Sequence, residues 1–121
     1  MAIARYIVDS VDDAVAFYRD HLGFAVEQQF GPAMAILTRN GLTLWLAGPT
    51  ASASRPMPDG RKPIPGGWNR FVIEVANLPE LVEALRRKSV PFRNEIVVGP
   101  GGKQILCEDP SGNLIELFEP T

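Results

Sequence analysis

The chain has 121 residues, of which 45% are hydrophobic and 21% are charged, a composition typical of one soluble globular domain. Its net charge of −2 creates no strong basic field, so we expect neither a nucleic acid nor a membrane as partner. The single Cys107 excludes an internal disulfide, and the first residues lack the pattern of a signal peptide, which together favour a cytoplasmic location.

The first part of the chain predicts a strand, a helix and three more strands. An apolar strand ends near Val8, and Ser10 is placed as the N-cap of a helix with Asp13 in its first turn. Apolar residues then recur at helical spacing as far as Gly23, which ends the helix. Strands are expected at residues 24–29, 33–38 and 42–47, and the Asn40-Gly41 pair is typical of a hairpin turn between the last two.

Residues 49–67 differ from the rest in composition. They hold five of the eleven prolines and few apolar residues, so we expect a linker or a flap over one face rather than a helix or strand. Trp68 follows directly, and its position leaves two roles open. Its ring either fixes the linker to the body of the protein or lines the mouth of a cavity.

The remaining residues repeat the order of the first part. A strand at 70–75 leads to Asn77 as helix N-cap, with Pro79 in the first turn and Glu80 three residues after the cap. Strands then follow at 95–98, 103–108 and 113–119. The sequence therefore predicts an α+β protein of two βαβββ modules, residues 1–48 and 68–121, joined by residues 49–67.

Alternation along the strands separates two faces of the predicted sheets. One face is apolar in every strand that we compared and is expected to receive the helices. The opposite face carries a mixture of aromatic and charged side chains, which is compatible with a solvated surface or with the lining of a pocket. These candidate ligand-binding residues are Arg5, Trp45, Arg70, Glu74 and Glu116.

Two further residues could carry chemistry but have simpler explanations. His21 lies near the C-terminal end of the first helix, where a cation suits the helix dipole, so we expect a surface or capping role. Cys107 is expected to be a small core residue rather than a reactive thiol, although the sequence does not show which face of its strand it occupies.

Two segments of the chain resemble a known family. The stretches "AVAFYRDHLGF" and "DPSGNLIELFEP", within paired βαβββ modules, resemble the vicinal oxygen chelate superfamily, which includes glyoxalase I, bleomycin-resistance proteins, fosfomycin-resistance enzymes and extradiol dioxygenases. The resemblance implies two modules whose curved mixed sheets form a cup with helices on the outer face. It also implies a homodimer. It does not identify a reaction, because the superfamily contains several kinds of enzyme as well as drug binders.

The resemblance also implies where a metal would bind. Members that use a metal take its ligands from equivalent strand positions of the two modules, which here are Ile3, Trp45, Arg70 and Glu116. Only Glu116 has a side chain that could coordinate a divalent cation, whereas a dedicated site needs about three or more such ligands. We therefore expect no metal and no other cofactor, and an ion pair between Arg70 and Glu116 instead.

Two functional hypotheses follow. The first is a metal-free protein that binds a small molecule in the cup, for sequestration of a drug or metabolite, with Arg5 and Arg70 facing an anionic or carbonyl group and Trp45 stacking on the ligand. The alternative is an enzyme of the lyase, isomerase or dioxygenase kind, in which Glu116 is a catalytic base or a metal ligand.

Overall fold

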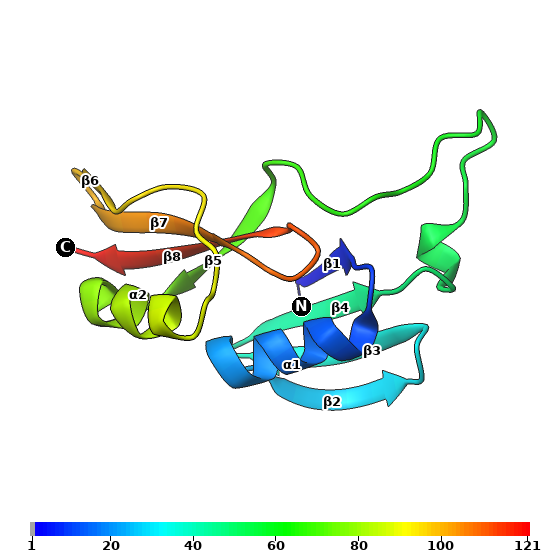
Figure 1. The fold of residues 1–121 in the computed structure, drawn as a ribbon, viewed down its shortest axis with the longest axis horizontal. Coiled ribbons are helices and arrows are strands. Elements are labelled where there is room, and N and C mark those ends of the chain that lie inside the picture. Colours follow the sequence, from blue (N-terminus) through cyan, green and yellow to red (C-terminus); the bar gives the residue numbers. More distant parts are fainter. Residues whose placement is uncertain (1) are drawn as a thin grey trace. The chain divides into compact units, whose positions relative to one another are not determined.

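A computed structural model describes residues 2–121 of the chain. The chain forms two compact units, Met1–Gly66 and Gly67–Thr121, each with the order βαβββ (Figure 1). The fold is thus α+β, with one four-stranded mixed sheet in each unit. None of the helices within residues 2–121 has the length and hydrophobicity needed to cross a membrane.

The first unit contains β1 (Ile3–Ile7), α1 (Val11–Leu22), β2 (Ala25–Phe30), β3 (Met34–Arg39) and β4 (Leu42–Ala47). Its sheet has the order β1-β4-β3-β2, in which β1 runs parallel to β4 and the other neighbours are antiparallel. A short 3₁₀ helix, η1 (Ser52–Ser54), follows in residues 49–67, so the expectation that this segment holds no helix is wrong for this one turn, which lies in its proline-free stretch.

The second unit repeats this arrangement. It contains β5 (Arg70–Glu74), α2 (Leu78–Arg87), β6 (Val97–Gly99), β7 (Gly102–Glu108) and β8 (Leu114–Pro120). The sheet order is β5-β8-β7-β6, and β5 runs parallel to β8. The predicted element order is confirmed, and the predicted strand ends lie within two residues of the observed ones.

Local signals in the sequence explain where the helices begin and end. Ser10 Oγ accepts a hydrogen bond from the Asp13 N–H at 3.2 Å, and Asn77 Oδ1 accepts one from the Glu80 N–H at 3.4 Å. Each cap satisfies a backbone donor that the first helical turn leaves unpaired. Gly23 ends α1 in the left-handed conformation, at φ 72°, which costs glycine little because it has no Cβ.

The hairpin between β3 and β4 sets the register of the first sheet. Asn40 and Gly41 have φ of 46° and 85°, as a two-residue turn that follows the twist of its strands requires. The turn pairs Arg39 with Leu42 and, further along, Ile36 with Trp45. All side chains of β4 therefore take the faces that alternation predicts.

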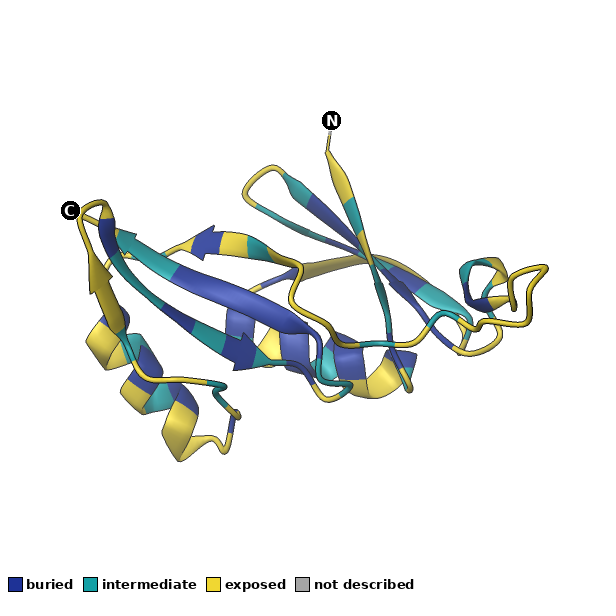
Figure 2. Ribbon diagram, turned by 90° about the horizontal axis from the view of Figure 1, so that it is seen from above, coloured by how far each residue is buried: buried dark blue, intermediate teal, exposed yellow. Residues whose placement is uncertain are grey.

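The core of each unit lies between its helix and its sheet. Figure 2 shows buried residues in the strands and along one side of each helix. In the first unit, Tyr18 of α1 is fully buried, as are Leu37, Leu44 and Leu46 of the sheet. In the second unit, Leu78 of α2 is likewise buried, together with the strand residues Ile105, Cys107, Ile115 and Leu117.

Cys107 belongs to this second core. Its side chain is inaccessible to solvent, and burial raises the pKa of its thiol to about 12. A thiol in these surroundings stays protonated and is a poor nucleophile. The expectation of a small core residue is confirmed, and the question of which face it occupies is settled.

The segment after β4 is fixed closely to the first unit. The Gly48 N–H donates to the Ala33 carbonyl at 2.8 Å, and Ser54 Oγ donates to the Gly48 carbonyl at 2.7 Å. A Cβ on Gly48 would lie 2.5 Å from the Pro32 carbonyl oxygen and 2.9 Å from Val11 Cγ2. Glycine is therefore required at position 48 by the close approach of the backbone.

We predict that Gly48→Ala lowers the free energy of unfolding by about 1–3 kcal/mol, because the added methyl group forces packed atoms apart. Gly101→Ala is the matched control, since a Cβ at that position meets nothing within 4 Å. Urea denaturation of both variants measures the effect. Equal stability of the two variants would contradict the proposed close packing at Gly48.

Candidate functional site

The face of the second sheet opposite α2 carries Arg70 and Glu116. In the parallel pair of β5 and β8, Arg70 lies across from Leu114 and Val72 lies across from Glu116. Arg70 and Glu116 therefore project from neighbouring strands on the same face, as alternation predicts. Leu106 of β7 lies across from Glu116 on its other side.

Arg70 and Glu116 form an ion pair. Nε and Nη2 of the guanidinium lie 3.1 and 3.0 Å from the same carboxylate oxygen, Glu116 Oε1. Nη1 also donates to the Trp68 carbonyl at 3.3 Å. Only 8% of the surface of Glu116 is accessible, so the guanidinium supplies the positive charge that a carboxylate in such a place needs.

The second oxygen of this carboxylate remains available. Oε2 of Glu116 accepts no hydrogen bond from any group within residues 2–121, because both donors of Arg70 converge on Oε1. Arg70, in turn, uses three of its five N–H donors within the protein. The pair therefore neutralises both charges and still has an acceptor and donors for a bound molecule.

A second arginine, Arg93, connects the residues just before β5 to the β7–β8 turn. Arg93 donates from Nε to Glu108 at 3.1 Å and from its two terminal nitrogens to the carbonyls of Gly67 and Gly112. Its guanidinium also lies over the Trp68 ring, 4.6 Å from the centroid. These contacts hold the Trp68 ring on Arg93 within the second unit, while 66% of the residue stays exposed.

In the first unit, Arg5 and Trp45 are direct neighbours. They are register partners in the parallel pair of β1 and β4, and the Arg5 guanidinium lies 4.9 Å from the centroid of the Trp45 ring. The contact is a cation–π interaction, which orients the guanidinium without neutralising its charge. Within the described chain, residues 2–121, Arg5 forms no ion pair with a carboxylate.

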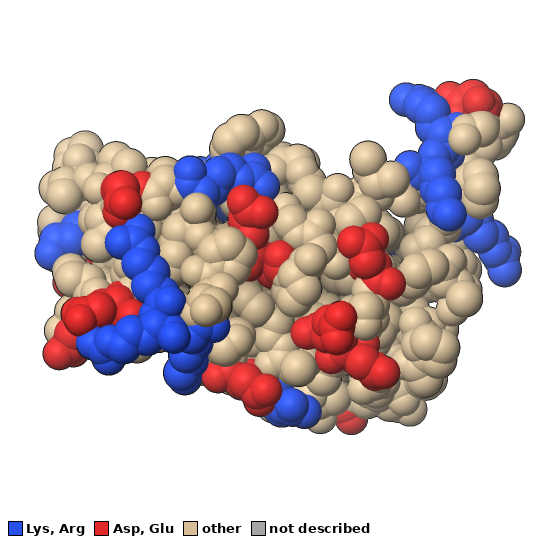
Figure 3. Space-filling model, viewed as in Figure 1, with Lys and Arg blue, Asp and Glu red and all other residues tan. Residues whose placement is uncertain are grey.

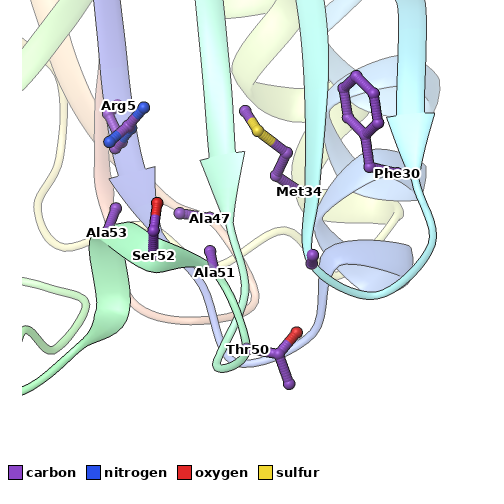
Figure 4. A pocket seen from close by; sticks show the side chains of 9 residues that line it. Arg5, Phe30, Met34, Ala47, Thr50, Ala51, Ser52 and Ala53 are labelled. Carbon is purple, nitrogen blue, oxygen red and sulfur yellow. The ribbon is translucent and has the colours of Figure 1, made fainter.

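A cavity of about 300 Å³ lies beside Arg5 in the first unit. Most of its wall is apolar, and among its lining residues within 2–121 Arg5 alone is charged. Figure 4 shows Arg5 and Ser52 on one side, Met34 and Phe30 on the other, and Thr50 pointing away from the rest. The lining residues are Arg5, Phe30, Ala33, Met34, Ala47, Thr50, Ala51, Ser52 and Ala53.

The donor chemistry does not fit a divalent metal ion. Of the residues at the four positions named by the family resemblance, Ile3 has an alkyl side chain, Trp45 an indole and Arg70 a cationic guanidinium. The fourth, Glu116, has one oxygen engaged by Arg70, whose charge opposes a cation at that place. Across residues 2–121, no three His, Cys, Asp or Glu side chains are grouped closely enough to hold a metal.

Two candidate residues lie apart from these groups. Glu74 is exposed at the C-terminal end of β5, whereas Arg70 begins the strand. Within residues 2–121, Glu74 forms no ion pair with Arg70 or any other residue. His21 is half-buried in the last turn of α1, where its ring packs edge-on against Phe17 at 5.4 Å between centroids. Its Nδ1 is buried and has no hydrogen-bond partner within residues 2–121, so the surface or capping role expected for His21 is not what the structure shows: the ring packs against the helix instead.

The sequence interpretation missed several residues of the cavity and of the Arg93 network. Ser52 and its neighbours were assigned to a linker, and only the three-dimensional course of that segment brings them to the cavity. Met34 was within reach of sequence reasoning, because the Asn40-Gly41 turn sets it opposite Ala47. Nothing in the sequence indicated the role of Arg93, because the segment after α2 shows no periodic pattern of apolar residues.

Charged groups elsewhere on the surface are mixed in sign. On the face shown in Figure 3, most of the surface is uncharged; acidic side chains gather near α1, and basic side chains are most numerous around α2, where acidic ones accompany them. Basic side chains gather on the segment before β5, where Arg55, Arg61 and Lys62 accompany Asp59. Arg61 is paired with Asp59 at 2.7 Å, which reduces the net charge of this segment.

Comparisons with known proteins agree with this architecture. The crystal structure of a member of the glyoxalase/bleomycin resistance protein/dioxygenase superfamily from Sphaerobacter thermophilus is 25% identical, with a TM-score of 0.76 over 98% of this chain and 95% of that one. Lactoylglutathione lyase from Agrobacterium tumefaciens is 22% identical, with a TM-score of 0.76 over 98% and 92% of the two chains. A bleomycin-binding protein from Streptomyces verticillus is 19% identical, with a TM-score of 0.65 over 99% and 95%.

These similarities extend to the family level. A search of curated proteins found no significant match. The family model described as Glyoxalase/Bleomycin resistance protein/Dioxygenase superfamily matches residues 2–117, which include the first sheet, both helices and the second sheet as far as the middle of β8. The chain therefore belongs to the glyoxalase/bleomycin resistance protein/dioxygenase superfamily.

Proposed function

We propose that this protein binds a small organic molecule without a metal ion and thereby sequesters a drug or metabolite. The observation that carries the proposal is the ion pair between Arg70 and Glu116. Of the four positions that the family resemblance names, only Glu116 has a metal-binding side chain, and a guanidinium fixed on the protein is its counter-charge. A protein with this arrangement has no need of a cation there and little capacity to hold one.

The first unit supports the binding part of the proposal. It has a largely apolar cavity with one cationic side chain at its wall, the combination that small-molecule sites commonly use. The bleomycin-binding protein from S. verticillus, whose crystal structure was determined with copper(II)-bleomycin, shows that a protein of this fold can bind a drug. By analogy, Arg5 and Trp45 of this chain are ligand-binding residues, and Arg70, Glu74 and Glu116 are candidates for the same role.

A cytoplasmic homodimer is the molecular form that we propose. The strands β2 and β6 are the edges of their sheets, and every residue of both is exposed. Such edges offer unpaired backbone groups to a second copy of the chain. The single cysteine is buried and unpaired, so nothing in the described residues requires an oxidising compartment.

We predict that a screen of organic compounds in buffer containing a chelator will find ligands that raise the thermal midpoint. A compound present at about a hundred times its Kd adds about 2.7 kcal/mol of stability, which shifts the midpoint by roughly 10 °C for a chain of this size. Divalent cations alone, added without chelator, are expected to produce no such shift. The proposal fails if only the cations stabilise the protein.

One observation favours catalysis as a second function. Glu116 Oε2 is free of hydrogen bonds within residues 2–121, so it could accept a proton or a hydrogen bond from a bound substrate. The enzyme would then be a lyase, isomerase or dioxygenase-like member of the superfamily that uses Glu116 as its base.

Glu116→Gln separates these two functions. For a substrate that the wild type converts, we predict that the variant loses turnover by about 10²-fold or more while its affinity for the same compound changes little. Glu83→Gln, which alters an exposed carboxylate on α2, controls for the loss of one charge. Full turnover in the Glu116→Gln variant would exclude Glu116 as the base.

A further inference from the structure

We infer that the cavity of the first unit binds an amphiphilic organic anion, with a flat apolar body and a single carboxylate or sulfonate group. The inference rests on the proposed binding function and adds to it the place and the chemical class of the ligand. Three features of the cavity carry it: an arginine without a counter-charge, an apolar wall, and a lining segment held in place by the fold.

Arg5 differs from most arginines of the described chain in lacking an acidic partner. Six others form ion pairs with Asp or Glu, and Arg39 donates to the Leu22 carbonyl. Arg5 instead lies over the Trp45 ring, which aims the guanidinium and leaves its charge and its N–H donors available. A guanidinium in this state is suited to a carboxylate or sulfonate, whose oxygens match its planar set of donors.

The apolar residues of the wall determine which chemical group suits the other end of the ligand. Phe30 has 47% of its surface exposed at this place, although solvent exposure of a phenyl ring is unfavourable. Met34 stands next to it, and a thioether side chain adapts to flat apolar surfaces. Ala33, Ala47, Ala51 and Ala53 have side chains of one carbon, which leave the cavity its volume of about 300 Å³.

The segment that completes the wall is not a loose flap. It is tied to the first unit by Ser54, whose hydroxyl is buried and bonds to the Gly48 carbonyl, and by the tight packing of Gly48. Figure 4 shows the Ser52 hydroxyl directed toward the side where Arg5 lies. It is therefore placed to donate to the same anionic group from a position that needs little ordering on binding.

These features give a definite order of preference among ligands of one shape. An anion gains charge-assisted hydrogen bonds from Arg5, a neutral alcohol gains only ordinary ones, and an ammonium ion meets a like charge. The apolar body contributes equally in all three cases. The difference in affinity among the three ligands consequently reports on Arg5.

The test compares 2-naphthoate, 2-naphthalenemethanol and 2-naphthylmethylammonium by isothermal titration calorimetry. We expect naphthoate to bind at least ~10-fold more tightly than the alcohol, and the ammonium ion to bind least. Arg5→Met keeps an apolar stem but removes the charge, and should reduce the preference for the anion to within ~2-fold. Arg55→Met is the matched control, because Arg55 lies outside the cavity and, within residues 2–121, also has no acidic partner.

A second variant locates the binding. Ala51→Phe fills the cavity and should weaken all the naphthyl compounds, and alanine-methyl NMR of the wild type should show shifts at Ala33, Ala47, Ala51 and Ala53 on addition of naphthoate. Equal affinity for the anion and the alcohol, no binding of any of the three, or shifts confined to other alanines would overturn the inference. None of these results would by itself refute the broader binding function, because the thermal-midpoint screen in chelator tests that function separately.

Discussion

The contact between Arg70 and Glu116 determines the chemistry of the second unit. A carboxylate within a strand, with 8% of its surface exposed, needs either a cation or several donors to remain there. The guanidinium of Arg70 meets that need from the neighbouring parallel strand. Because the cation is a side chain of the protein, the carboxylate keeps its place in the strand without a bound ion.

The two units share one topology but differ in whether the arginines discussed above are paired with carboxylates. In the second unit Arg70 and Arg93 are both paired with glutamates, and Arg93 also fixes Trp68 and the glycine turn before β5. In the first unit Arg5 is held only by an aromatic ring and lies beside an apolar cavity. The repeat therefore supplies a common scaffold, and substitutions at equivalent strand positions give each half its own surface.

The sequence was sufficient for those features that depend on short-range rules. The caps at Ser10 and Asn77, the turn at Asn40-Gly41 and the alternation of strands gave the elements and the faces of Arg5, Trp45, Arg70 and Glu116. The cavity was out of reach because it depends on where residues 50–53 fold back onto the first sheet, which no local pattern encodes. The role of Arg93 was equally hidden, since its partners Glu108, Gly67 and Gly112 are distant in the sequence.

A double-mutant cycle on Arg70 and Glu116 tests the central claim most directly. Arg70→Met, Glu116→Gln and the double variant are compared by urea denaturation, with and without excess Zn²⁺, and the exposed pair of Arg87 and Glu83 is treated in the same way as a reference. We predict a coupling free energy of about 1–3 kcal/mol for Arg70 and Glu116 that Zn²⁺ leaves unchanged, against about 0.5 kcal/mol or less for the reference pair. Additive effects, or a coupling that disappears when Zn²⁺ stabilises the wild type, would show that a metal rather than Arg70 is the partner of Glu116.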